Sequence, residues 1–220
     1  MKIAIIGTAE QAAECRLKFG EAHAWSVFPN VLQAAKAGTT ADAVFDFVSP
    51  HNPAHLAEYT AEPPMVVFLE SSCSRLSSLA GHTGKSKGQI FGFCGLPTFL
   101  NRPVLEVSLL PESNRELLAS TCSSLATPFE IVADQPGMVT PRIIAMIINE
   151  AYITLEEGTA TREDIDLAMK LGTNYPYGPF EWADRIGLSN VVSILESSYR
   201  DTGDERYRIC PLLLAGARAG

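Results

Sequence analysis

The feature that most constrains the fold is a change of hydrophobic pattern at Asp134-Gln135-Pro136-Gly137. Before this turn-rich tetrapeptide, short apolar runs alternate with polar stretches that are compatible with helix, which is typical of a mainly parallel sheet flanked by helices. After it, the apolar residues recur at helical spacing. We therefore predict an α/β domain over residues 1–135 and an all-α domain over residues 136–220.

The expected elements follow from the length and spacing of the apolar runs. Seven short, almost uniformly apolar runs predict strands, several of them buried on both faces: Lys2–Gly7, Trp25–Phe28, Ala43–Val48, Met65–Leu69, Gln89–Cys94, Val104–Leu109 and Phe129–Ala133. Helical spacing, caps and stops predict five helices: Arg142–Glu157 closed by Gly158, Thr161–Leu171 capped by Thr161 and ended by Gly172, Phe180–Ile186 behind Pro179, Val191–Tyr199 capped by Ser189, and Pro211–Arg218.

Charge and cysteine content exclude several classes of function. The chain has 25 acidic and 17 basic residues, a net charge of −8, and no dense cluster of Lys and Arg, which argues against nucleic-acid and anionic-membrane partners. Its five cysteines form no C-x-x-C pair, so they indicate reduced thiols and no metal site. No stretch approaches the ~18 apolar residues of a spanning helix. We expect a soluble, cytoplasmic protein.

Several motifs follow the tetrapeptide in order and nearly without gaps: Asn149-Glu150-Ala151, Glu156-Glu157-Gly158, Glu163–Asp166, Lys170-Leu171-Gly172, Pro176–Glu181 and Asp184–Gly187. With them, the segment from Gly137 to Gly220 resembles the C-terminal domain of the 3-hydroxyacyl-CoA dehydrogenase family, NAD-dependent enzymes that oxidise the 3-hydroxyl of acyl-CoA thioesters. The resemblance implies a Rossmann-like N-terminal domain and a helical domain like that of 6-phosphogluconate dehydrogenase. It also implies a homodimer formed through the helical domain, NAD as cofactor and an acyl-CoA-like ligand.

The catalytic residues of the family are only partly matched. Residues 92–107 can be laid without gaps on the family's catalytic strand and loop, which puts Cys94 at the position of the general-base His and Glu106 at that of its partner Glu. A thiol with a reference pKa near 8.5 does not reproduce an imidazole near 6.5, and a neighbouring carboxylate raises the thiol pKa further. Cys94 as a nucleophile is a weaker alternative, because Glu106 has the wrong charge to favour a thiolate.

Other family positions are also altered. Two asparagines of the family correspond to the Pro97-Thr98 pair and to Pro141, and proline offers no side-chain donor. Ser72 and Ser74 remain as candidates for a hydroxyl contact to substrate, beside Ser71. Helix capping and loop solvation are equally good explanations of these serines.

The nucleotide-binding fingerprint keeps only its first glycine. A dinucleotide fold normally carries G-x-G-x-x-G straight after its first strand, and here Gly7 is followed by Ala9 and Ala12, the remaining cofactor-binding candidates. Glu10 places a carboxylate beside the expected pyrophosphate. The second strand ends in Phe28-Pro29, without the acidic residue that binds the ribose hydroxyls.

Two further patterns are weak. Gly84-Lys85-Ser86 resembles the end of a phosphate-binding loop but leads into a strand instead of a helix. His51 and His55 have metal-like spacing, yet Pro53 lies between them and no ligand set is complete, which favours a solvated loop.

The sequence therefore predicts a 3-hydroxyacyl-CoA dehydrogenase-like protein whose catalysis is impaired and whose binding of an acyl-CoA-like ligand is retained. One alternative is an active NAD-dependent oxidoreductase with rebuilt base and cofactor contacts, since the fold does not fix the function. Another is a structural dimerisation module.

Overall fold

The computed structural model describes residues 1–59, 65–81 and 89–219. The chain divides into two compact units, Met1–Met138 and Val139–Gly220. Across the described residues, every helix is too short or too polar to pass through a bilayer.

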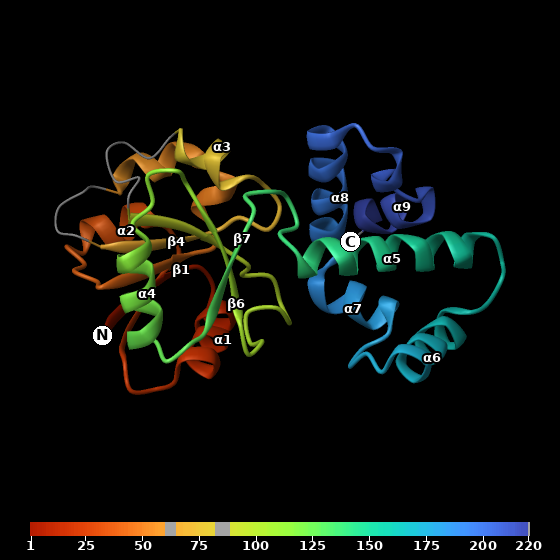
Figure 1. The fold of residues 1–220 in the computed structure, drawn as a ribbon, viewed down its shortest axis with the longest axis horizontal. Coiled ribbons are helices and arrows are strands. Elements are labelled where there is room, and N and C mark those ends of the chain that lie inside the picture. Colours follow the sequence, from red (N-terminus) through yellow and green to blue (C-terminus); the bar gives the residue numbers. More distant parts are fainter. Residues whose placement is uncertain (60–64, 82–88, 220) are drawn as a thin grey trace. The chain divides into compact units, whose positions relative to one another are not determined.

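The N-terminal unit is built on a seven-stranded sheet in the order β2-β1-β3-β4-β5-β6-β7 (Figure 1). Its strands are β1 Lys2–Ile6, β2 Ala24–Phe28, β3 Ala43–Asp46, β4 Val66–Glu70, β5 Ile90–Phe93, β6 Leu105–Leu109 and β7 Phe129–Val132. Neighbouring strands are parallel except β5 and β6, which are antiparallel. The predicted strands and the Rossmann-like α/β class are confirmed.

The order of the strands creates a switch point at β1. The chain passes from β1 to β2 on one side and then crosses back to β3 on the other. Because such crossovers are right-handed, α1 (Ala9–Phe19) and α2 (Val31–Lys36) cover opposite faces of the sheet. Open α/β sheets bind ligands outside the carboxyl ends of the strands at this kind of point, which here is the segment that follows Ile6.

The two faces of the sheet carry different cores. Under α1 and α4 (Arg115–Ser124) lies an aromatic core, in which the ring of Phe45 stacks between Phe19 and Phe68 at centroid distances of 4.8 and 4.7 Å. The opposite face is aliphatic and is covered by α2, the 3-10 helix η2 (Pro53–Glu58) and α3 (Leu76–Ala80). A second 3-10 helix, η1 (Ser49–His51), packs against β4. The central strands are therefore buried on both faces, as their uniformly apolar runs predict.

In its described residues the C-terminal unit is helical. Its helices are α5 Thr140–Glu156, α6 Arg162–Thr173, α7 Pro179–Ile186, α8 Leu188–Thr202 and α9 Pro211–Ala219, with a 3-10 turn η4 at Glu205–Tyr207. The helix α5 contacts α7, α8 and α9, and α6 packs on α7 (Figure 1). The five predicted helices are confirmed.

Two of the predicted helix boundaries are wrong. Gly172 lies inside α6, which continues until Asn174 adopts a left-handed conformation with φ of 56°. Ser189 also lies inside its helix, because α8 begins directly after Gly187. In contrast, the hydroxyl of Thr161 accepts the N–H of Asp164 at 3.2 Å, and Gly158 has φ of 69° just after α5, as predicted.

The motifs of the C-terminal unit hold its helices together. The carboxylate of Asp166 caps α7 by accepting the N–H groups of Phe180 and Glu181 at 2.8 and 3.2 Å. The Nζ of Lys170 lies 2.7 Å from Oε1 of Glu181, whose Oε2 accepts the N–H of Gly178 at 3.0 Å. These residues join α6 to α7, so the strongest part of the family resemblance has a structural basis.

Candidate functional site

The turn after β1 is closed by the chain's own side chains. Oε1 of Gln11 accepts the N–H of Thr8 at 2.9 Å, and Oγ1 of Thr8 accepts the N–H of Gln11 at 3.3 Å. This reciprocal capping box satisfies main-chain donors that a bound pyrophosphate would use at the start of α1. A Cβ atom added at Gly7 would lie 2.3 Å from Oε1 of Gln11. The space above the remaining glycine is therefore taken by Gln11.

The two alanines of the altered fingerprint have different environments. Ala12 is buried in the aromatic core and lets α1 pack closely on the sheet, whereas Ala9 is exposed at the start of the helix. Glu10 is exposed in the first turn, and the Thr8 hydroxyl and a main-chain N–H hold its pKa below the usual range. A carboxylate is thus favoured at the position where the fingerprint receives phosphate.

The end of β2 also lacks a group for the adenosine ribose. Asn30 follows Phe28 and Pro29, and its Oδ1 accepts the N–H of Gln33 at 3.0 Å, which caps α2. As they stand, the residues of this crevice do not fit NAD unless the Gln11 side chain moves away. The three predicted cofactor contacts, Gly7, Ala9 and Ala12, remain a prediction.

The structure brings the two predicted catalytic residues to adjacent strands. The antiparallel pairing of β5 and β6 sets Phe93 opposite Val107, so the next residue along β5, Cys94, lies beside Glu106. Cys94 is only 3% exposed. Burial raises the pKa of its thiol well above the usual range, and the charges of Glu70 and Glu106 raise it further. A raised pKa favours the thiol over the thiolate, and the role of Cys94 as a general base or a nucleophile remains a prediction.

Glu70 is a member of this site that sequence reasoning missed. It ends β4, is 6% exposed, and its Oε1 accepts the N–H of Ser72 at 2.9 Å. Burial raises its pKa, while hydrogen bonds from Ser72 and Gly95 and the charge of His51 lower it. The available signal was a carboxylate that directly continues a strand predicted to be buried on both faces.

Replacing Glu70 by Gln is expected to stabilise the protein increasingly as the pH rises. Because burial raises the folded-state pKa, the stability that Glu70 contributes is fully present below its unfolded-state pKa of ~4.3 and is lost as the pH rises through the folded-state value. The Gln side chain keeps an oxygen for the N–H of Ser72. Urea unfolding of both proteins between pH 4 and pH 8 measures the difference, and a difference that is constant or shrinks with pH contradicts the assignment.

The predicted substrate serines are separated by the structure. The hydroxyl of Ser72 is buried beside the thiol of Cys94 and the carboxyl of Glu70, in no well-aligned hydrogen bond. Ser74 lies two residues further on in a turn, where its N–H donates to the carbonyl of Ser71 at 3.2 Å. Only Ser72 is thus brought to the Cys94 site, and a contact of either serine to substrate remains a prediction.

The loop after Cys94 carries local backbone strain. Thr98 has φ of 75°, an outlier for a β-branched residue. Its N–H donates to Oε1 of Glu14 on α1 at 3.4 Å, and burial raises the pKa of Glu14. Pro141, the other altered asparagine position, is buried in the first turn of α5. Thr98, at the first altered asparagine position, therefore connects the loop to α1.

A second buried carboxylate at the carboxyl edge of the sheet is structural. Asp46 ends β3 and accepts the N–H groups of Val48 and Ser49, both at 2.8 Å, and the hydroxyl of Tyr59 at 2.6 Å. Burial and the charge of Asp46 raise the pKa of Tyr59 well above its usual range. These bonds hold the segment after β3 in place.

Of the two weaker patterns, only that of His51 and His55 lies in the described residues. His51 lies in η1 and His55 in η2, where Nε2 of His55 is 3.1 Å from Nδ2 of Asn52. Within residues 1–59, 65–81 and 89–219, no three His, Cys, Asp or Glu side chains are placed to hold a metal ion. Gly84-Lys85-Ser86 lies outside the described residues.

The comparisons with known proteins fit this geometry. Residues 137–220 match the family model of the 3-hydroxyacyl-CoA dehydrogenase C-terminal domain. A 3-hydroxyadipyl-CoA dehydrogenase of Escherichia coli (strain K12) is 50% identical over 82 residues, 37% of this chain and 17% of that protein. A 3-hydroxybutyryl-CoA dehydrogenase of Bradyrhizobium diazoefficiens is 33% identical over 169 residues, 72% of this chain and 55% of that protein. Residues 137–220 are thus a 3-hydroxyacyl-CoA dehydrogenase C-terminal domain, and the chain is similar to enzymes of that family.

The solved structures show the same fold. FadB2 of M. tuberculosis has a TM-score of 0.80 at 19% identity, and the match covers 100% of this chain and 94% of that one. The (S)-3-hydroxybutyryl-CoA dehydrogenase PaaH1 of Ralstonia eutropha has a TM-score of 0.73 at 20% identity, with the same coverage.

The sequence match is strongest where the residues are structural. The chain spans 17% of the Escherichia coli relative and 55% of the Bradyrhizobium relative. The stretch that matches the family model, residues 137–220, contains the bonds of Asp166, Lys170 and Glu181 that join α6 to α7. The comparisons therefore establish the scaffold, and the chemistry depends on the altered site of the N-terminal unit.

Proposed function

We propose that this 3-hydroxyacyl-CoA dehydrogenase-like protein is catalytically impaired and retains the binding of an acyl-CoA-like ligand. The observation that carries the proposal is the burial of Cys94, beside Glu70 and Glu106, at the position that the family's general base occupies. A 3-hydroxyl can be oxidised only if a group takes its proton, and a thiol with a raised pKa cannot do so at neutral pH. Loss of a general base lowers a rate by a factor of ~10²–10⁴.

The site keeps polar groups that support ligand binding. The Ser72 hydroxyl lies at the carboxyl edge of the sheet without a well-aligned partner, and it can donate to a carbonyl oxygen. In the family, NAD accepts the hydride when it is bound, and in this chain Gln11 and Glu10 oppose its binding. Proton transfer is the part of the chemistry that this chain's own residues would perform, and Cys94 cannot perform it.

Three measurements on the full chain test the proposal: NADH titration by fluorescence, acetoacetyl-CoA titration by calorimetry, and turnover of both together. We expect acetoacetyl-CoA to bind and turnover to be absent or very slow. Rapid turnover would contradict the impairment. Failure to bind either compound would favour a structural dimerisation module.

An active oxidoreductase with a rebuilt base is the second candidate, and one observation favours it. The helix η1, which carries His51, packs on β4, and the charge of His51 acts on the buried carboxyl of Glu70. This pair could replace the altered Cys94 and Glu106. In that case any measured turnover is lost in His51→Asn and survives in the matched change His55→Asn.

We call the turn at Gly7 together with the start of α1 the nucleotide cradle. Removing the side chains that close this cradle is expected to strengthen NADH binding. In Glu10→Gln/Gln11→Ala, the carboxylate and the side chain above Gly7 are both removed, and the N–H groups at the start of α1 become available to phosphate. We expect the affinity for NADH to rise by about tenfold, equivalent to ~1.4 kcal/mol. Fluorescence titration checks this, with Glu21→Gln as the control; an unchanged affinity would show that the cradle is not the obstacle.

We further propose a homodimer formed through the C-terminal unit. Leu167 and Leu171 on α6 are 54% and 78% exposed, one helical turn apart, which is unusual for two large apolar residues on one stripe. Leu167→Glu/Leu171→Glu should give a monomer in light scattering while the wild type gives a dimer. A monomeric wild type would rule out this dimer.

A further inference from the structure

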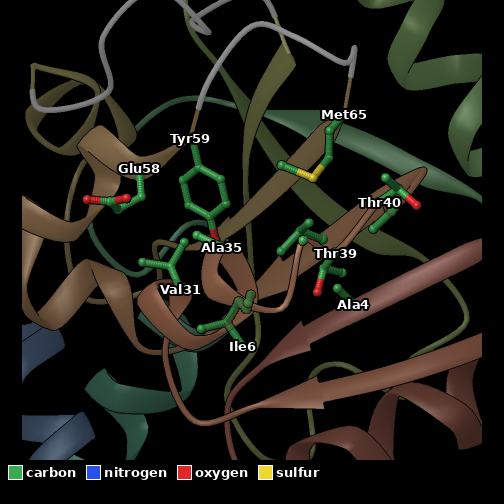
Figure 2. Close-up of a pocket in the computed structure, with 13 residues that line it drawn as sticks. Ala4, Ile6, Val31, Ala35, Thr39, Thr40, Glu58, Tyr59 and Met65 are labelled. Carbon is green, nitrogen blue, oxygen red and sulfur yellow. The ribbon is translucent and has the colours of Figure 1, made fainter.

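A pocket of about 450 Å³ lies on the aliphatic face of the N-terminal sheet (Figure 2). Its floor is formed by Ala4 and Ile6 of β1 and Val44 of β3, and its walls include Val31 and Ala35 of α2. Figure 2 shows the Tyr59 ring and the Met65 side chain on the side opposite Ile6. The volume is within the range of small-molecule sites.

The pocket exists because the cover over this part of the sheet is thin. The helix α2 has only six residues, two of its lining residues are alanines, and the chain then passes through Gly38 and Thr39 to β3. The small residues Ala34, Ala35 and Gly38 therefore face a floor of aliphatic groups. On the opposite face, phenylalanine rings fill the corresponding layer.

The pocket is a different site from the turn after β1, which contains Gln11, and from the surroundings of Cys94. Neither of those residues lines it. Several of its lining residues, Thr40, Ala41 and Met65, precede β3 and β4 and so lie toward the amino ends of these strands. In contrast, Cys94 follows β5 at its carboxyl end. A ligand in the pocket would thus leave the residues of the proposed function untouched.

The chemistry of the described lining disfavours an anionic ligand. Among the described residues that line the pocket, Glu58 is the only charged one, and it would repel an anion. The Tyr59 hydroxyl already donates to Asp46 at 2.6 Å, so the ring presents mainly its carbon edge and face. Met65 supplies a flexible thioether that adapts to apolar shapes. Among the described lining residues, the hydroxyls of Thr39 and Thr40 add further polar side-chain groups.

We propose that this pocket binds the aliphatic chain of a neutral small molecule, with the chain against Ile6 and Val44. Because transfer of one CH₂ group from water contributes ~0.8 kcal/mol, each additional buried CH₂ should strengthen binding by about fourfold. A carboxylate on the same chain should weaken binding by about tenfold or more, since the charge must leave water and approach Glu58. The inference is independent of the proposed function.

The experiment uses the full chain labelled with ¹³C at the methionine methyl groups. Titration with 1-octanol should move the Met65 resonance, identified by Met65→Leu, saturably and more than the other four methionine signals. The shorter 1-hexanol should bind more weakly by about fourfold for each CH₂ removed, and octanoate more weakly than 1-octanol. No shift of Met65, equal shifts of all methionines, or equal binding of octanoate would overturn the proposal.

Matched substitutions on α2 separate pocket binding from surface binding. Ala35→Leu fills the pocket and should abolish the response of Met65, whereas Gln33→Leu adds the same side chain at a position of α2 that does not line it. If Ala35→Leu does not fold, Thr39→Leu fills the pocket from its other side. A Met65 response that persists in the folded blocking variant would also overturn the proposal.

Discussion

Replacing Cys94 by His is expected to raise the rate of acetoacetyl-CoA reduction by a factor of roughly 10²–10⁴ in a chain whose cradle is opened by Glu10→Gln/Gln11→Ala. Cys94 lies beside Glu106 on the adjacent strand, and the charge of that carboxylate favours a protonated imidazole. The imidazolium can donate its proton to the keto oxygen. Turnover of NADH with acetoacetyl-CoA measures the gain against the same background with Cys94.

Two controls show whether the gain comes from the proton-transfer group. Cys94→Ser keeps the size of the side chain without adding a base, so it should give no gain. Glu106→Gln in the Cys94→His background should reduce the gain and shift its pH dependence, because the imidazole loses its charged partner. A folded Cys94→His protein with the rate of Cys94→Ser would show that the missing imidazole is not what limits this chain.

Gly178→Ala is expected to lower the free energy of unfolding of the C-terminal unit by about 2–4 kcal/mol. A Cβ atom at this position would lie 2.3 Å from Cγ and 2.5 Å from Cβ of Asp166. Asp166 would have to move, and its bonds to the N–H groups of Phe180 and Glu181 would be lost. Urea unfolding followed by circular dichroism measures the change.

Gly172→Ala is the matched control in the same motif region. Gly172 lies within α6 and has open space where its Cβ would be. An alanine there should stabilise the protein by about 0.5–1 kcal/mol, since glycine is unfavourable inside a helix. Equal effects of the two substitutions would contradict the role assigned to Gly178 and Asp166.

The fold could be predicted because short runs of apolar residues indicate which strands and which helix faces are buried. Runs such as Ile3–Ile6 are apolar at every position, which is typical of a strand covered on both faces. The errors at Gly172 and Ser189 arise where packing lengthens a helix beyond its local signals. Helix ends depend on partners such as Asp166, which lies 14 residues before Phe180.

The site could be predicted in part. The gap-free match places Cys94 and Glu106 on neighbouring strands, and the antiparallel register brings them together. The sequence also contains a signal for the side chain of Gln11 closing the nucleotide cradle, since Thr8 and Gln11 have the spacing of a capping box. The burial of Glu70 had one signal, its position directly after a strand predicted to be buried, whereas its contact with Ser72 could not be predicted, because it depends on how the ends of β4 and β5 are covered.

The most direct test of the account is the turnover number of the unmodified full chain with saturating NADH and acetoacetyl-CoA, measured beside a 3-hydroxybutyryl-CoA dehydrogenase of the family. We predict a value lower by at least a factor of about 10², with acetoacetyl-CoA still bound. A turnover number equal to that of the reference enzyme would contradict the account.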